Sequence, residues 1–185
     1  MNVFFIFIIL FSLLIIILFF SSPKLSPIPY FPSNKKDLSL IIKALNLKNN
    51  QVVFDLGAGD GIVIFEAAKL AFEKKLNTKF FAIEINPILI LIMWLRWLFH
   101  PNKKNIKIVC DDIFKIDFKR YKLQVTSYTF YLYISPWYLE KIIKNLKLKI
   151  KNFTLVSYFY PVPKMKAKKI FEGKNKVFVY SINYS

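Results

Sequence analysis

A short run of glycines and acidic residues is the part of this sequence best suited to chemistry. The apolar segment 52–56, which contains Asp55, runs into Gly57-Ala58-Gly59-Asp60-Gly61, and apolar residues at helical spacing follow from Ile62. This order predicts a strand, a tight glycine turn and a helix. Glycines permit a sharp turn and a close approach of a ligand, and a helix N-terminus favours polar or anionic groups. The segment therefore predicts a ligand-binding turn.

The glycine spacing separates two kinds of binding turn. A dinucleotide-binding turn has Gly-x-Gly-x-x-Gly, and counting from Gly57 its third glycine would fall on Ile62. Here Gly61 comes one residue earlier, and Asp55 lies two residues before the first glycine. The pattern disfavours a dinucleotide. A glycine turn in an α/β domain that binds no ligand is the alternative.

Acidic residues also follow the next two predicted strands. Glu84 ends one and Asp112 follows the other, while open parallel sheets bind ligands at the carboxyl ends of their strands. A carboxylate at Glu84 can accept from ribose hydroxyls, and one at Asp112 can accept from an adenine amino group, with Ile85 or Ile113 packed on the adenine faces. Each acid alone could be a solvated loop charge. Together with Asp55, they indicate one site.

The rest of the sequence predicts the elements that hold this site. Strands that alternate with helices imply a parallel sheet covered on both sides. A closing hairpin is predicted at 168–171 and 176–181. Strands are expected at 51–56, 79–85, 106–110, 124–134 and 153–159, and helices at 35–47, 62–72, 87–99 and 136–148.

The N-terminus predicts a membrane anchor. Val3 to Phe20 is apolar except for Ser12, and as a helix it would be about 27 Å long, close to the hydrocarbon thickness of a bilayer. No Lys or Arg precedes it and no Ala-x-Ala site follows, which favours a retained span over a cleaved signal peptide. Lysines after the segment place the domain in the cytoplasm by the positive-inside rule. The expected organisation is an anchor at 1–22, a proline-rich linker at 23–34 and a catalytic domain at 35–185.

The charge balance favours anionic partners without identifying one. Lys and Arg number 28 against 11 acidic residues, a formal net charge of +17. This charge suits lipid headgroups or nucleic acid. An abundance of Lys, together with Asn, Ile and Phe, is however also typical of proteins encoded by an AT-rich genome. A single cysteine, Cys110, excludes an internal disulfide, and with the single His100 it argues against a metal site.

The glycine turn and Asp55 resemble motif I of the class I S-adenosylmethionine (SAM) methyltransferases. From about residue 3 to 163 the chain also resembles the membrane-anchored protein-lysine methyltransferases that act on the c-ring protein of ATP synthase and on the adenine nucleotide translocase. It departs from them at Ile62, where an Arg is expected, and in its short tail, and both departures concern the substrate. The resemblance is carried by the apolar N-terminus, Phe31-Pro32, the segment 55–61, Glu84-Ile85-Asn86-Pro87, Asp112-Ile113-Phe114, Leu139-Glu140-Lys141, Val156-Ser157 and Pro161.

This resemblance implies a Rossmann-like seven-stranded sheet with an antiparallel C-terminal hairpin, preceded by one transmembrane helix. It implies SAM as the cofactor, with Asp55 facing the methionine part. The SAM-binding residues it implies are Asp55, Gly57, Ala58, Gly59, Gly61, Glu84, Ile85, Asp112 and Ile113.

Aromatic residues after the fourth predicted strand favour lysine as the acceptor. The Asn/Asp-Pro-Pro-Tyr/Phe tetrapeptide of many base-amino methyltransferases is absent from the segment 129–137. Methyl transfer to lysine needs alignment and a deprotonated amine, and an aromatic channel lowers the amine pKa by desolvation and holds the product by cation–π contact. The alternative is that these are ordinary core aromatics. The expected catalytic residues are Tyr131, Tyr133 and Trp137, with Tyr30, Phe31, Tyr158 and Tyr160 as further walls.

The sequence as a whole predicts a membrane-anchored, SAM-dependent methyltransferase that acts on a lysine of a membrane or membrane-proximal protein. An RNA or small-molecule methyltransferase is the alternative enzyme. A non-catalytic, membrane-tethered binding module that keeps the fold is the alternative from another class.

Overall fold

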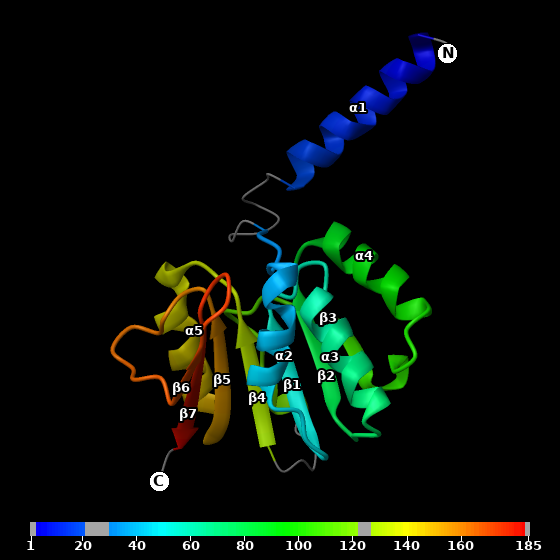
Figure 1. Ribbon diagram of the computed structural model, residues 1–185. Coiled ribbons are helices and arrows are strands. Elements are labelled where there is room, and N and C mark those ends of the chain that lie inside the picture. The colour runs from blue at the N-terminus through cyan, green and yellow to red at the C-terminus, as the bar shows by residue number, and fades with distance from the viewer. Residues whose placement is uncertain (1–2, 21–29, 122–126, 184–185) are drawn as a thin grey trace. The chain divides into compact units, whose positions relative to one another are not determined.

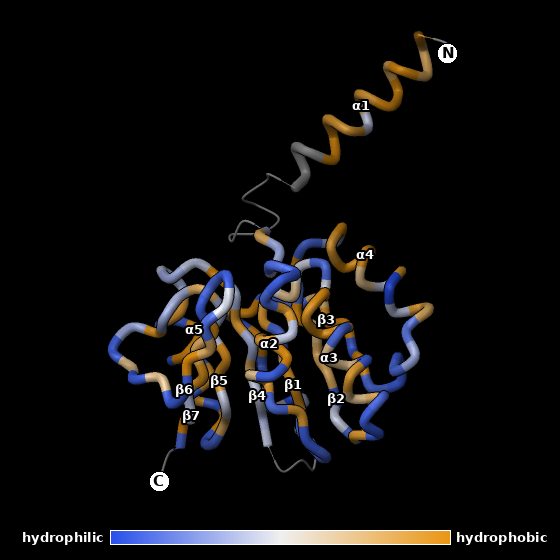
Figure 2. Tube along the Cα trace, viewed as in Figure 1, coloured by the Kyte–Doolittle hydropathy of each residue, from blue (hydrophilic) through white to orange (hydrophobic). Residues whose placement is uncertain are grey.

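The computed structural model describes residues 3–121 and 127–183 except 21–29, and the side chains at 17–20 and 119 lie outside the described part. The chain divides into two compact units, Met1–Phe31 and Pro32–Ser185. The first contains the helix α1 (Val3–Phe20), which is apolar along its described length except at Ser12 (Figure 2). All of its described side chains are exposed.

The predicted anchor is only partly reproduced. A helix forms over Val3–Phe20 as expected. Within the part of the chain that the structure describes, however, no helix has both the length and the apolar character needed to cross a membrane. The transmembrane span predicted at 1–22 is therefore not supported. The single-pass, cytoplasm-facing localisation depends on that span and stays a prediction, and most of the linker predicted at 23–34 lies outside the described residues.

The second unit is built on a seven-stranded sheet of order β3-β2-β1-β4-β5-β7-β6 (Figure 1). The first five strands along the chain are parallel, whereas β7 runs antiparallel to β5 and to β6. This confirms the predicted seven-stranded methyltransferase sheet with its antiparallel hairpin. The strands are β1 (Gln51–Leu56), β2 (Lys79–Glu84), β3 (Ile106–Cys110), β4 (Ser127–Leu132), β5 (Asn152–Tyr158), β6 (Lys169–Phe171) and β7 (Val177–Asn183).

Helices cover both faces of this sheet, as the alternating pattern predicts. Two of them, α2 and α3, lie on one face and α5 lies on the other (Figure 1). Pro87 stands at the start of α4, where its missing N–H costs nothing, and the Asn86 side chain caps that helix by accepting from the Ile88 N–H. The helices are α2 (Leu38–Leu45), α3 (Ile62–Glu73), α4 (Pro87–Leu98) and α5 (Pro136–Lys149), with short 3-10 turns η1 (Lys35–Asp37), η2 (Lys103–Asn105) and η3 (Phe118–Tyr121).

Strand alternation decides which side chains reach which face. Phe130 of β4 stacks on Phe54 with ring centroids 5.1 Å apart and meets Phe118 edge-on, on the face that α5 covers. The next residue, Tyr131, points to the opposite face. Asp55 is its register partner on β1, so these two side chains share the face covered by α2 and α3.

A buried carboxylate joins the beginning of the domain to its end. Asp37, in η1, accepts hydrogen bonds from the Tyr158 hydroxyl (2.7 Å) and from the backbone N–H groups of Lys174 (2.6 Å) and Asn175 (2.9 Å). A Cβ at Gly173 would lie 2.7 Å from Leu40 and closer still to Asp37, so the β6–β7 loop packs without a gap here. We call these contacts the Asp37 network.

The Asp37 network makes the stability pH-dependent. Burial raises the pKa of Asp37, but the hydrogen bonds, led by the one from Tyr158, outweigh it and lower that pKa below its usual value. A carboxyl whose pKa is lowered by folding stabilises the folded state above its unfolded pKa, about 4, and loses this contribution as the pH falls.

We therefore expect Asp37→Asn to lower the free energy of unfolding by about 1–3 kcal/mol at pH 7, because buried donors lose their charged acceptor. The difference from wild type should begin to shrink below about pH 4, where Asp37 of the unfolded chain binds a proton, and shrink further as the pH falls toward the lowered pKa of Asp37 in the folded protein. Urea unfolding at pH 7 and pH 3.5 measures both values, and Glu140→Gln, an exposed acid, is the matched control. An equal difference at the two pH values would contradict this account.

Candidate active site

The glycine turn (57–61) connects β1 to α3 at the carboxyl edge of the sheet. Its three glycines all have positive φ, at 84°, 58° and 77° for Gly57, Gly59 and Gly61. The N–H groups of Gly57 and Ala58 both donate to the Ile83 carbonyl at 2.9 Å, which ties the turn to the end of β2. The predicted strand, turn and helix are therefore all present.

Close packing fixes the identity of Gly61 in particular. A Cβ there would lie 2.7 Å from a ring carbon of Phe65 and 2.9 Å from Met93 Cγ, so α3 and α4 leave no room for a side chain. At Gly57 the nearest atom to a Cβ would be Ile134 Cγ2, at an ordinary 3.7 Å. The two positions therefore need glycine for different reasons: Gly57 for its backbone conformation, and Gly61 for both conformation and space.

Glu84 holds the turn in place from β2. Its Oε2 accepts from the Gly59 N–H at 2.8 Å, and its Oε1 accepts from the N–H groups of Ile85 and Asn86, both at 2.9 Å. The side chain is buried. A carboxylate offers about four acceptor positions, so Oε2 keeps capacity for another donor, which fits the predicted role toward a ribose hydroxyl.

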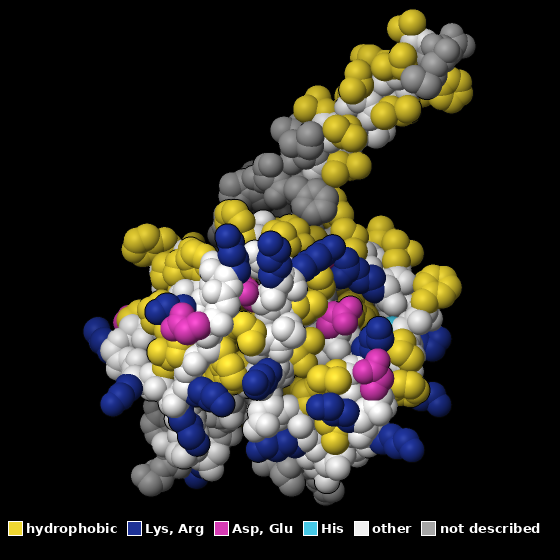
Figure 3. Space-filling model, viewed as in Figure 1, with side chains coloured by type: hydrophobic (Ala, Val, Ile, Leu, Met, Phe, Trp, Pro, Cys, Tyr) yellow, Lys and Arg dark blue, Asp and Glu magenta, His cyan; other side chains and the backbone are white. Residues whose placement is uncertain are grey.

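Three carboxylates, those of Asp55, Asp60 and Glu84, lie close together around the turn. Burial first, then the charges of Glu84 and Asp60, raises the pKa of Asp55 well above its usual range. On the visible face in Figure 3, Lys and Arg side chains are spread widely and acidic ones are few. The turn is thus an acidic site in a cationic protein.

These carboxylates fit SAM better than a dinucleotide. SAM carries an ammonium and a sulfonium beside one carboxylate, whereas a dinucleotide brings an anionic pyrophosphate. A buried Asp whose ionisation is disfavoured gains most from a cationic ligand group, because the opposite charge restores the carboxylate. The residues present therefore fit SAM.

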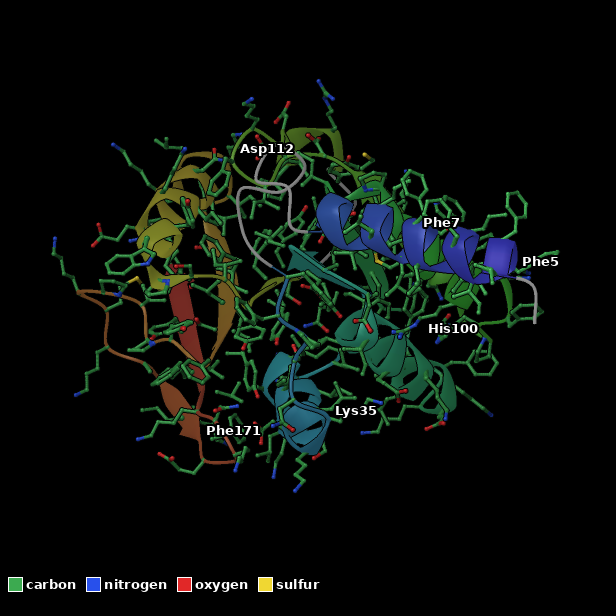
Figure 4. The ribbon with its side chains drawn as sticks, turned by 90° about the horizontal axis from the view of Figure 1, so that it is seen from above. Phe5, Phe7, Lys35, His100, Asp112 and Phe171 are labelled. Atoms are coloured by element: carbon green, nitrogen blue, oxygen red, sulfur yellow. The ribbon has the colours of Figure 1, made fainter. Side chains whose placement is uncertain are left out.

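The predicted adenine-binding residues lie just after two neighbouring strands, Ile85 after β2 and Asp112 and Ile113 after β3. Asp112 is half-buried, its Oδ1 accepts from the Phe114 N–H at 2.9 Å, and its Oδ2 is 3.6 Å from the exposed ammonium of Lys115. Ile113 is buried and Ile85 is half-buried. Figure 4 places Asp112 on the opposite side of the domain from Lys35 in η1.

The three predicted catalytic aromatics are placed differently from one another. Tyr131 is buried, its hydroxyl lies 2.9 Å from Ser33 Oγ, and burial followed by the charge of Asp55 raises its pKa well above the usual value. Tyr133 is half-buried and packs edge-on against Tyr158 at 4.8 Å. Trp137, at the start of α5, is 85% exposed.

Arg96 is a site contact that sequence reasoning missed. Its guanidinium donates to the Asp60 carbonyl and to Asp60 Oδ2, both at 2.9 Å, and so ties α4 to the glycine turn. The sequence does offer one indication of this contact. Most cationic residues of the chain are lysines, and an arginine among them suits a paired contact, because its planar guanidinium can donate two hydrogen bonds at once. His100 has a structural contact, with Nε2 3.0 Å from the Phe65 carbonyl.

Comparison with known proteins gives the following similarities, although no family model matches the chain. The chain is 26% identical over 166 residues to a Caenorhabditis elegans protein named as a lysine N-methyltransferase of the ATP synthase c-subunit, and the match covers 84% of this chain and 81% of that protein. The Xenopus laevis protein of the same name is 24% identical over 157 residues, 84% of this chain and 64% of that protein.

Solved structures share the fold. An RNA methyltransferase from Salinibacter ruber, in complex with S-adenosyl-L-homocysteine, superposes with a TM-score of 0.70 at 19% identity, over 84% of this chain and 95% of that one. The predicted resemblance to class I methyltransferases is confirmed, and the predictions of a methyltransferase enzyme and of SAM as its cofactor agree with these similarities. The roles of individual site residues stay predictions.

The two glycine positions give a test of the turn. We expect Gly57→Ala to lower the free energy of unfolding by about 1–2 kcal/mol, because alanine is strained at positive φ. Gly61→Ala should cost about 1–3 kcal/mol more, because its methyl group also overlaps Phe65 and Met93. Urea unfolding of both variants measures the difference. Equal costs would mean that the packing around Gly61 is looser than described.

The role of Glu84 gives a second test. Glu84→Gln replaces one acceptor oxygen by an amide group that cannot accept from the backbone, so the turn should loosen and SAM affinity should fall about tenfold or more. Calorimetric titration of SAM into the full chain measures the affinity. Glu66→Gln, an exposed acid on α3, is the control and should bind like wild type. Wild-type affinity in Glu84→Gln would remove Glu84 from the site.

Proposed function

We propose that this chain transfers a methyl group from SAM to the ε-amino group of a lysine in a protein. The observation that carries the proposal is the pairing of Asp55 with Tyr131 across β1 and β4, which sets the acidic turn directly beside the aromatic end of β4. The similarity to two proteins named as lysine methyltransferases supports it.

The acidic residues at the ends of β1, β2 and β3 would each bind a different part of SAM. Asp55 would pair with the ammonium of the methionine part, Glu84 would accept from the ribose through its remaining acceptor position, and Asp112 would accept from the adenine amino group. When bound, SAM supplies a methyl group on a positively charged sulfur, which is the electrophile. Rigid backbone contacts hold Glu84, so this alignment needs little rearrangement.

The end of β4 would meet the acceptor amine. A lysine must reach the methyl group deprotonated, and an aromatic, half-buried environment favours the neutral amine by desolvation. The raised pKa values of Tyr131 and Tyr133, caused first by burial, keep both phenols protonated and neutral. They therefore act as walls and hydrogen-bonding partners, while the proton lost by the acceptor passes to water.

RNA is the second candidate acceptor. The net charge of +17 favours it, and a Methanosphaera stadtmanae protein named as a probable ribosomal RNA small-subunit methyltransferase is 27% identical over 124 residues, 65% of this chain and 36% of that protein. The absent Asn/Asp-Pro-Pro-Tyr/Phe tetrapeptide after β4 counts against a base amino group. Lysine is therefore preferred.

The test is a labelling experiment with the full chain. Tritiated SAM is incubated with separate protein and RNA fractions of the source cells, and acid hydrolysis of the labelled protein identifies the methylated residue. We expect label in methylated lysine and none with Asp55→Asn. Label confined to RNA would overturn the lysine proposal and support the second candidate.

Replacing Asp55 should make the ligand-free protein more stable but weaken its binding of SAM. Because its pKa is raised on folding, Asp55 reduces the stability of the ligand-free protein as the pH rises above about 4. We expect Asp55→Asn to increase the free energy of unfolding by about 0.5–2 kcal/mol at pH 7 and to have little effect at pH 4. SAM affinity should fall about tenfold or more.

Thermal unfolding at both pH values and calorimetry at pH 7 measure these effects. Asp117→Asn, which changes an acid outside the turn, is the matched control. A variant that is less stable than wild type at pH 7 would show that Asp55 is a structural acceptor and not a ligand-binding group.

A further inference from the structure

The backbone at the end of β5 forms a strained turn. Phe159 has a φ of +73°, in a region that bulky residues rarely adopt. The Tyr160 N–H donates to the Tyr158 carbonyl at 3.0 Å, which closes a three-residue γ-turn of the positive-φ kind, and such turns are rare and strained. Strain of this kind is concentrated at active sites and ligand-binding segments.

Surrounding contacts hold the strained conformation in place. The Phe159 N–H donates to the Lys176 carbonyl at 2.9 Å, and Ser157 Oγ donates to the Tyr160 carbonyl at 2.7 Å. The Asp37 network holds the side chain of Tyr158, the residue directly before Phe159. A structural role alone would not require a bulky residue at this φ, since glycine would make the same backbone hydrogen bonds without strain.

The turn brings two aromatic rings next to Tyr133. The rings of Phe159 and Tyr160 have centroids 4.6 Å apart at an angle of 61°, and Phe159 and Tyr133 have centroids 6.4 Å apart at 37°. Phe159 is 42% exposed, and the other two rings are half-buried. A ligand can therefore reach rings of different orientation within one small area.

This area adjoins the cofactor turn. Tyr133 follows β4, and the next residue, Ile134, stands within van der Waals distance of where a Gly57 side chain would be. Glu84 and Asp112 lie on the other side of β1, toward β2 and β3. The strand order thus separates the cofactor residues from the aromatic rings while keeping them at the same carboxyl edge.

We propose that Tyr133, Phe159 and Tyr160 form an aromatic subsite that binds the ammonium group of the acceptor lysine and of its methylated products by cation–π contact. The inference rests on the proposed lysine methylation and adds where the acceptor binds. Electron-rich faces attract alkylammonium groups, and the contact is stronger where water is partly excluded. The strain at Phe159 is the cost of presenting its ring.

The first arm of the test measures recognition of charge. A peptide with a central trimethyllysine, and a neutral copy in which carbon replaces the quaternary nitrogen, are titrated into the full chain saturated with S-adenosylhomocysteine. Wild type should bind the charged peptide roughly three- to thirtyfold more tightly. This preference should disappear in Phe159→Leu and Phe159→Gly and persist in Phe159→Tyr. Phe72→Leu, an exposed aromatic on α3, is the control.

The second arm separates a binding role from a structural one. Phe159→Gly relieves the positive φ, so its Tm should rise by about 2–4 °C although charge recognition is lost. SAM affinity should stay at the wild-type value in every Phe159 variant. A lower Tm together with an unchanged peptide preference would show that Phe159 is a packing residue and would overturn the proposal.

Different outcomes would overturn the aromatic subsite and the proposed lysine methylation. Label in lysine with an unchanged KM for the acceptor in Phe159→Leu overturns the aromatic subsite and leaves lysine methylation standing. A preference for the charged peptide that depends on Phe159, with label only in RNA, would show that the rings bind an alkylammonium group, but it would overturn the proposed reaction and with it the assignment of that group to an acceptor lysine.

Discussion

The hydrogen bonds accepted by Glu84 are the interaction on which the rest of the site depends. One carboxylate on β2 holds the Gly59 N–H of the neighbouring β1–α3 turn and two N–H groups of its own strand end. It acts together with the Ile83 carbonyl, which accepts from Gly57 and Ala58, to hold a loop whose glycines all have positive φ in one conformation. The sheet itself positions Asp55, which pairs with Ala82 of β2 and Tyr131 of β4.

Two buried acids, Asp37 and Glu84, connect segments that are distant along the chain. Asp37 does for the N-terminal segment and the β6–β7 loop what Glu84 does for the glycine turn, because both carboxylates accept backbone N–H groups from distant segments. Asp55 differs, since burial and its acidic neighbours disfavour its charge. This difference supports the ligand-binding role proposed for Asp55.

Much of the sheet could be predicted from sequence, because strand and helix periods alternate and the glycine spacing is distinctive. Asp55, Glu84 and Asp112 could be placed at one edge, since parallel strands bring their carboxyl ends together. The expected N-terminal helix forms over Val3–Phe20, whereas the membrane crossing predicted at 1–22 is not supported within the described residues.

Other features had no signal in the sequence. Nothing in Tyr-Phe-Tyr reveals that Phe159 has a positive φ, because the constraint comes from β7 and from Ser157. Trp137 follows a strand like Tyr133, yet the start of α5 turns it outward. Partners distant along the chain, such as Arg96 for Asp60, likewise depend on how α4 packs.

The Asp37 network also orders events during synthesis. The ribosome completes η1 early, whereas Lys174 and Asn175, which donate to Asp37, are made 137 and 138 residues later. Since chains emerge N-terminus first, Asp37 lacks these two donors until the β6–β7 loop has left the tunnel. A nascent chain that ends before this loop therefore lacks part of the network that orients Tyr158.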